Sequence, residues 1–221
     1  MKNIAWLERT ELLVQEQGLK NLISKHVMVV GLGGIGSFAA EFIARAGVGK
    51  MTIVDGDDID PTNANRQLPA LTSTIGKSKA QLMADRLLDI NPELDLTVIE
   101  EFLSPERTWE VVTSELDYVM DCIDSVTPKI NLLTACRRKK IRVVSSMGAG
   151  GIMDPAQVMV RDISKTYNCV LAKQVRKRLK KIKIDKGIRT VFSSEIPAPN
   201  SLKMTNGANY KKSFYGTISY M

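Results

Sequence analysis

A glycine-rich loop followed at a distance by a carboxylate is the first group of residues whose types and spacing could do chemistry. Four glycines share one loop after the short apolar run 27–30, namely Gly31, Gly33, Gly34 and Gly36. Such glycines permit a tight turn and let a phosphate approach the backbone, while the first amides of a following helix attract anions. A second apolar run ends in Asp55, and a carboxylate there can accept hydrogen bonds from ribose hydroxyls. The pattern predicts a nucleotide-binding strand–helix–strand unit and leaves the nucleotide open.

Further polar residues follow the same strands. Asn63 and Arg66 lie in an acid-rich loop beyond the second strand, and Lys79 opens the helix expected at 78–90. Ligands of open parallel sheets bind beyond the carboxyl ends of the strands. The loop is therefore either a triphosphate and metal site or a self-neutralising surface. Asp124 follows a later strand, where a carboxylate is either the N-cap of the next helix or a Mg²⁺ ligand.

The elements that must position these residues alternate in type. Apolar runs at 27–30, 51–54, 94–99, 117–121 and 141–146 predict strands, separated by helices at 37–46, 78–90, 105–114 and 127–140. This order predicts an α/β fold, a doubly wound and mainly parallel Rossmann-like sheet. We expect an N-terminal helical arm (1–25) with Gly18 ending its first helix, a nucleotide-binding core (26–164), and a C-terminal extension (165–221) packed on the same domain.

Charge is distributed unevenly along the chain. The net charge is +7, but residues 161–221 hold 14 basic and 3 acidic residues. The basic helix expected at 170–184 accounts for much of this excess and predicts a polyanion site at Arg176, Lys177, Lys180 and Lys181. The alternatives are a solvated face and a membrane-surface helix, although such helices favour aromatic residues that this one lacks.

Length and cysteine content exclude several classes of protein. No apolar run of membrane-spanning length occurs in the 221 residues, and the N-terminus has no signal-peptide pattern, so we expect a cytoplasmic protein without membrane contact. Cys122, Cys136 and Cys169 are scattered, which argues against a disulfide framework. The apolar end, 215–221, indicates a truncated chain or a segment completed by a partner.

The four signals in order are GLGGIG, Asp55, the pair NANRQ and GKSKA, and DCID. They resemble the superfamily of ATP-dependent adenylating enzymes related to ubiquitin-activating enzymes and to activators of sulfur-carrier proteins, over residues 9 to about 160. The resemblance implies an ATP site with phosphates on the glycine loop, ribose on Asp55, the triphosphate on Asn63, Arg66 and Lys79, and Mg²⁺ on Asp124. In homodimeric members an N-terminal arginine reaches the partner's ATP site, and Arg9 lies at that position; its alternative is a solvated charge.

The sequence differs from common members of that superfamily in its cysteines, and these differences limit which activities we expect. Sulfur-carrier activators commonly hold zinc through two CxxC pairs, but this chain has no CxxC and a single histidine, His26, so no zinc is expected. A thioester cysteine would have to be Cys169, for which we favour a packing role.

Three longer segments, 31–67, 121–141 and 146–155 with the basic helix beyond, are similar to the tRNA threonylcarbamoyladenosine dehydratases. That resemblance implies ATP-dependent activation of the carboxylate of a modified adenosine at position 37 of tRNA, then ring closure with loss of water. It implies tRNA, a second copy of the chain and sulfur-relay proteins as partners, and a C-terminus shorter than usual. The alternatives are adenylation of a sulfur-carrier or ubiquitin-like C-terminus, and a dinucleotide-dependent oxidoreductase or nucleotide-binding module.

Overall fold

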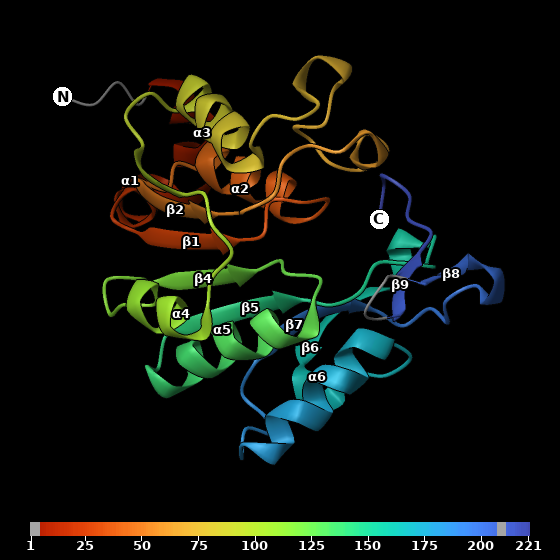
Figure 1. Ribbon diagram of the computed structural model, residues 1–221. Coiled ribbons are helices and arrows are strands. Elements are labelled where there is room, and N and C mark those ends of the chain that lie inside the picture. The colour runs from red at the N-terminus through yellow and green to blue at the C-terminus, as the bar shows by residue number, and fades with distance from the viewer. Residues whose placement is uncertain (1–4, 207–210) are drawn as a thin grey trace.

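The core of the molecule is a seven-stranded sheet. The computed structural model describes residues 5–206 and 211–221 (Figure 1). The strand order is β3-β2-β1-β4-β5-β7-β6, and all neighbours are parallel except β6 and β7. The strands are β1 (His26–Val30), β2 (Lys50–Val54), β3 (Asp95–Ile99), β4 (Tyr118–Asp121), β5 (Arg142–Ser146), β6 (Val158–Asp162) and β7 (Arg189–Ser193).

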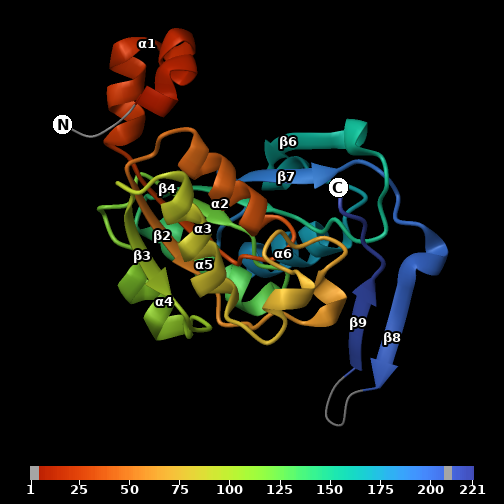
Figure 2. The same cartoon turned by 90° about the horizontal axis from the view of Figure 1, so that it is seen from above.

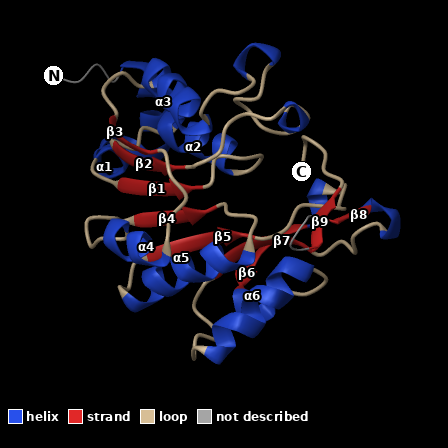
Figure 3. Cartoon of the chain, viewed as in Figure 1, coloured by secondary structure: helices blue, strands red, loops and turns tan. Residues whose placement is uncertain are grey.

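Helices cover both faces of this sheet, which confirms the doubly wound α/β fold (Figure 3). One face carries α2 (Gly36–Arg45) and α3 (Lys79–Ile90), and the other carries α4 (Pro105–Val111), α5 (Val126–Arg138) and α6 (Val170–Lys181). Strand β1 lies between the two layers, with Val27 and Val29 packed toward α2 and Met28 and Val30 toward α5. Burial on both faces explains why its sequence is a continuous apolar run.

The strand order reverses at β1, and the predicted nucleotide-binding residues follow the strands on either side of this reversal. Strand β1 pairs with β2 on one side and β4 on the other, so that Val30 is level with Val54 and with Asp121. Loops after these three strands therefore leave the sheet side by side at its carboxyl edge. Ligands of open α/β sheets bind at such a reversal.

The N-terminal arm lies at the opposite, amino-terminal edge of the sheet, where it stands out from the body (Figure 2). Helix α1 (Glu8–Ile23) is interrupted at Gln15, which has φ 65° and ψ 166°. The expected break at Gly18 was wrong: a Cβ there would lie 2.8 Å from Cβ of Val14, so Gly18 supplies close packing next to the kink. Residues 1–4 of the expected arm lie outside the described residues.

The C-terminal segment contributes to the sheet as well as to the surface. Strand β7 lies between β5 and β6, and beyond it β8 (Leu202–Asn206) and β9 (Lys211–Tyr215) form a separate antiparallel pair that we did not expect. The sequence signal for that hairpin is Asn206-Gly207, a pair typical of tight hairpin turns. Short 3-10 helices occur at Ala5–Leu7, Pro61–Asn63, Thr72–Thr74, Pro155–Gln157, Ile163–Lys165 and Pro199–Ser201. Within the described residues, no helix is long and apolar enough to span a membrane.

Candidate nucleotide-binding site

The glycine loop connects β1 to α2, and two of its positions admit only glycine. Gly31 has φ +88°, and a Cβ there would lie 2.9 Å from the carbonyl oxygen of Cys122. A Cβ at Gly36 would lie 1.7 Å from the carbonyl oxygen of Gly31, so any side chain would force the start of α2 away from the strand. The loop therefore holds the N-terminus of α2, with its unpaired amides, against the sheet edge.

Asp55 fastens this loop to the end of β2. Its Oδ2 accepts a hydrogen bond from the amide of Leu32 at 2.6 Å, and its Oδ1 accepts one from the amide of Asp57 at 2.8 Å. Burial raises the pKa of Asp55, and these two amides oppose the rise. Each carboxylate oxygen retains acceptor capacity beyond one hydrogen bond. Asp55 can thus shape the loop and still accept from a ribose hydroxyl.

Arg66 lies over the glycine loop. Its Cγ would be 3.3 Å from a Cβ on Gly34, and its guanidinium donates to the carbonyl of Thr62 at 3.0 Å and to Oδ1 of Asn65 at 2.8 Å. Among the described residues no carboxylate pairs with Arg66. Asn63 is buried and builds the turn that presents Arg66, since its Oδ1 accepts from the amide of Asp60 at 3.1 Å.

Lys79 reaches the same edge from the first turn of α3. Its side chain is almost fully buried, and its Nζ donates to Oδ2 of Asp57 at 3.0 Å. Asp57 is a residue of this edge that sequence reasoning did not single out among the acids of the loop. Asp55, Asp57 and Lys79 therefore form one chain of contacts that connects β2 to α3.

Asp124 lies in the turn between β4 and α5, two residues beyond Cys122, whose carbonyl faces Gly31. The N-cap of α5 is Ser125, so the N-cap alternative for Asp124 was wrong. The Asp124 side chain is exposed at the carboxyl edge. Among the described residues, no group of three or more His, Cys, Asp or Glu side chains is arranged to hold a metal ion. Asp121 anchors the turn, since its Oδ1 accepts from the amide of Ile123 at 3.2 Å.

A buried ion pair beneath this turn was also missed. Nζ of Lys129 lies 2.8 Å from Oδ2 of Asp121, and both side chains are completely buried. Nζ also donates to Ser146 O at 2.9 Å, and the Ser145 hydroxyl donates to Asp121. The pattern DCIDSVTPK contains both partners, eight residues apart, but only the tertiary structure shows that Lys129 points inward.

Gln67 is a further residue that sequence reasoning missed. It is buried beside the glycine loop, its Nε2 would lie 3.6 Å from a Cβ on Gly33, and its Oε1 has no hydrogen-bond partner among the described residues. A buried amide with an unsatisfied oxygen is rare in a folded protein. This orphaned oxygen beside the loop is consistent with a polar ligand at this place.

The other predicted site residues lie elsewhere. Arg9 is exposed on α1, which packs at the amino edge through Leu7 and Gly47. Helix α6 covers the α5 face; Lys177, Lys180 and Lys181 are exposed on it, whereas Arg176 is half-buried and donates to the Thr166 hydroxyl. Within one chain, neither Arg9 nor α6 joins the glycine loop.

The cysteines show no sign of nucleophilic activation. Burial raises the pKa of the Cys122 and Cys136 thiols to about 12, so both stay protonated at neutral pH. Cys169 is the N-cap of α6, where its sulfur accepts from the amide of Ala172 at 3.5 Å. The packing role favoured for Cys169 agrees with this position.

Comparison with known proteins identifies the family. The model of the ThiF family matches residues 7–209. The chain belongs to the ThiF family. Among relatives of this ThiF family chain, the tRNA threonylcarbamoyladenosine dehydratase of Bacillus subtilis is 45% identical over 189 residues, which cover 86% of this chain and 74% of the relative. The enzyme of the same name from Escherichia coli is 43% identical over 201 residues, which cover 86% of this chain and 75% of the relative.

A solved structure resembles this ThiF family member over nearly its whole length. The crystal structure of the Escherichia coli dehydratase in complex with ATP has a TM-score of 0.85 and 41% identity, covering 90% of this chain and 86% of that chain. The resemblance inferred from GLGGIG, NANRQ, GKSKA and DCID is thereby confirmed.

Proposed function

We propose that this chain is an ATP-dependent tRNA threonylcarbamoyladenosine dehydratase. The observation that carries the proposal is the identity of 45% and 43% to enzymes of that name over 86% of the chain. The site supports it, because a glycine loop, an unpaired arginine and a buried lysine meet at one sheet edge. An oxidoreductase that binds a dinucleotide has no need of two fixed cations and an exposed carboxylate there.

Each residue then has a role in binding. The glycine loop and the N-terminus of α2 take the phosphates of ATP, and Asp55 takes the ribose. Asn63 holds the turn that presents Arg66 and lies within reach of the triphosphate. Lys79 exchanges Asp57 for a phosphate. Asp124 would hold Mg²⁺, which would supply positive charge to offset that of the phosphates.

The chemistry proceeds in two displacements. The substrate carboxylate attacks the α-phosphorus of ATP and releases pyrophosphate, while Arg66 and Lys79 offset the charge that builds on the phosphates. A second group of the same side chain then attacks the activated carbonyl carbon, loses its proton and releases AMP. The ring closes with the net loss of one water. Because this attack is intramolecular, proximity supplies much of the rate and no catalytic cysteine is needed.

One experiment decides between this reaction and its rivals. The protein is incubated with ATP, Mg²⁺ and tRNA that bears threonylcarbamoyladenosine, and the modified nucleoside is weighed by mass spectrometry. We expect a product lighter by one water, with AMP and pyrophosphate formed in equal amounts. Unchanged nucleoside mass, with the tRNA bound, would refute the proposal.

The main rival is adenylation of a sulfur-carrier or ubiquitin-like C-terminus. Both reactions begin with carboxylate attack on ATP, so pyrophosphate exchange alone does not separate them. Exchange supported by a carrier protein with a free C-terminal carboxylate, and not by modified tRNA, favours the rival. The basic helix α6 favours RNA, because exposed Lys177, Lys180 and Lys181 offer a polyanion site rather than a protein-tail groove.

We expect the chain to act as a homodimer. Leu12 and Leu13 of α1 are 74% and 82% exposed, and Phe42 of α2 is 64% exposed. An apolar cavity of about 410 Å³, lined by Phe38 and Phe42, opens beside Gly34 on the α2 face. A partner's α1 in that cavity would cover these side chains and place its Arg9 near the glycine loop. We expect the protein to act in the cytoplasm, because its proposed reaction uses ATP and tRNA. Contact with sulfur-relay proteins stays a prediction.

A further inference from the structure

The basic surface of α6 continues onto the end of α5, away from the nucleotide site. Helix α5 ends in the segment Arg137-Arg138-Lys139-Lys140, and all four side chains are exposed. Helix α6 and the loop after it end beside them, with exposed cations at Lys180, Lys181, Lys183 and Lys186. Figure 1 shows both helices running from the carboxyl edge of the sheet toward its amino edge. These cations belong to two segments that the sequence separates by about 40 residues.

Two contacts join the segments into one surface. The guanidinium of Arg138 donates to the carbonyl of Ile182 at 3.2 Å. That of Arg137 lies against Gly187, where a Cβ would be only 2.7 Å away. In the part of the chain that the structure describes, none of these arginines and lysines has an ion-pair partner. The only acid within the two segments is Asp185.

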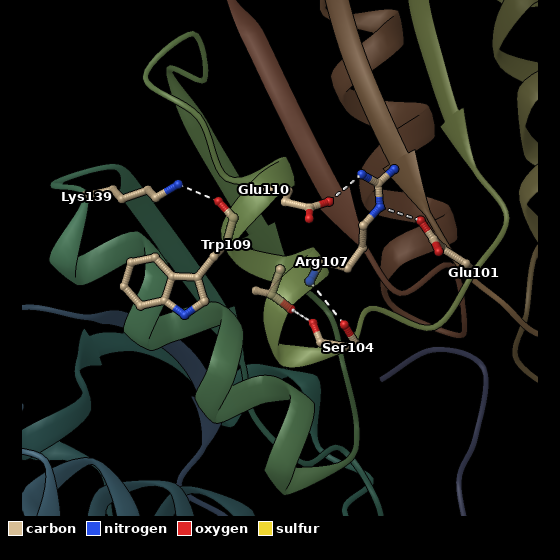
Figure 4. A network of polar contacts seen from close by, with 7 residues as sticks. Glu101, Ser104, Arg107, Trp109, Glu110 and Lys139 are labelled. Atoms are coloured by element: carbon tan, nitrogen blue, oxygen red, sulfur yellow. Dashed lines mark hydrogen bonds and ion pairs between the residues drawn. The ribbon is translucent and has the colours of Figure 1, made fainter.

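Not every cation near α5 belongs to this surface. Figure 4 shows Lys139 turned toward α4, where it donates to the carbonyl of Trp109 and lies 5.6 Å from the centre of its ring. In the same network Arg107 pairs with Glu101 and Glu110. We therefore define the basic end by seven residues with uncommitted charge: Arg137, Arg138, Lys140, Lys180, Lys181, Lys183 and Lys186.

The chemistry of the basic end fits a phosphate backbone. No aromatic residue occurs in the segments 137–140 and 180–187, whereas recognition of unpaired bases relies on aromatic platforms. A membrane surface fits poorly, because the apolar side of α6 is already buried through Ala172, Val175 and Leu179. Spaced arginines and lysines without stacking partners are typical of contacts to the phosphates of a double-stranded stem.

The position of the basic end shows which part of an RNA it would meet. Helix α5 begins two residues after Asp124 and contains 13 residues, so its last turn lies about 18 Å from the reaction edge. A nucleotide whose carboxylate reaches Asp124 cannot also contact Arg137. We propose that the basic end holds the helical stem of the substrate RNA while the modified nucleotide occupies the ATP edge, an inference that rests on the proposed function.

A thermodynamic cycle between protein and RNA tests this inference. The double variant Arg137→Gln/Lys140→Gln removes two exposed cations. The control is Arg45→Gln/Lys50→Gln, which changes net charge equally at the end of α2 and the start of β2. Fluorescence anisotropy measures Kd for full-length modified tRNA and for stem-loops around position 37 whose stems are shortened stepwise. We expect about tenfold weaker binding of the full-length tRNA by the first variant, and a salt slope lower by roughly 2.

The dependence on stem length carries the decision. The loss of RNA affinity in the Arg137→Gln/Lys140→Gln variant should shrink with each deleted base pair and disappear for the shortest stem-loop. The control variant should bind every RNA with the affinity of the parent. Equal losses on all RNAs, or none on any, would overturn the inference. So would lost binding to phosphatidylserine vesicles with unchanged RNA affinity, since this would assign the surface to a membrane. If the parent protein binds these RNAs but removes no water, the proposed function fails while the binding cycle still decides the stem contact.

Discussion

At the scale of single residues, the candidate site combines accessible charged groups with buried groups that hold them in place. Arg66 and Asp124 are accessible at the carboxyl edge and have no ion-pair partner among the described residues. Asp121 and Lys129 are fully buried below them. Substitutions in the two groups should therefore fail in different ways.

Asp124→Asn should abolish turnover and leave tRNA affinity nearly intact. The amide keeps the size of the side chain but removes the charge that holds Mg²⁺. Single-turnover assays measure the first effect and anisotropy with labelled tRNA the second. A large loss of tRNA affinity would contradict the metal assignment, because α6 does not depend on Asp124.

Lys129→Met should lower the free energy of unfolding by about 3–5 kcal/mol, because it leaves the Asp121 carboxylate buried without its counter-charge. Denaturant titration followed by circular dichroism measures this loss.

The double variant Asp121→Leu/Lys129→Met separates stability from positioning. It should regain most of the stability, since an apolar pair needs no ion pairing. It should still bind Mg²⁺–ATP weakly, because the hydrogen bond from Ile123 to Asp121 that fixes the Asp124 turn is gone. Nucleotide affinity like that of the parent would show that the pair is purely structural.

At the scale of elements, α6 divides its residues between packing and charge. Ala172, Val175 and Leu179 are buried. Arg176 donates a hydrogen bond to the Thr166 hydroxyl, so it holds the helix in place in addition to contributing positive charge. Lys173 and Lys177 are exposed one turn apart on the outer face. Binding and packing on this helix can therefore be tested separately.

Lys173→Gln/Lys177→Gln should weaken tRNA binding and lower its salt slope by roughly 2, because fewer counterions are released. Glutamine has nearly the helix propensity of lysine, so the far-ultraviolet circular dichroism should not change. Titrations at several salt concentrations give the slope. An unchanged slope would assign this half of α6 to a solvated surface.

At the scale of the whole molecule, α1, which carries Arg9, and the loop after β1 lie at opposite edges of one sheet (Figure 1). A single chain cannot bring them together without moving α1 across the sheet. A second copy can, and the exposed Leu12 and Leu13 on α1 favour an apolar contact of this kind. The dimer is therefore a prediction about catalysis as well as about assembly.

Mixing Arg9→Ala with Asp124→Asn should restore activity if Arg9 acts across the dimer. After subunit exchange at equal amounts, half of the dimers are mixed and each has one complete site, so about a quarter of wild-type turnover should return. Each variant alone should stay inactive. No recovery in a mixture whose exchange is confirmed by native mass spectrometry would mean that Arg9 acts within its own chain or not at all.

The sequence by itself determined the alternation of strands and helices and the group of ligand-binding residues at one sheet edge. Both follow from local chemistry: apolar runs form buried strands, only glycine fits at Gly31 and Gly36, and parallel strands bring their following loops to one edge. The tertiary structure alone decided the partners across that edge. It showed that Lys129 turns inward to Asp121, that Ser125 rather than Asp124 caps α5, and that the ends of α5 and α6 merge into one basic surface. These outcomes depend on contacts between residues far apart in sequence or on the direction of a side chain, neither of which local spacing specifies.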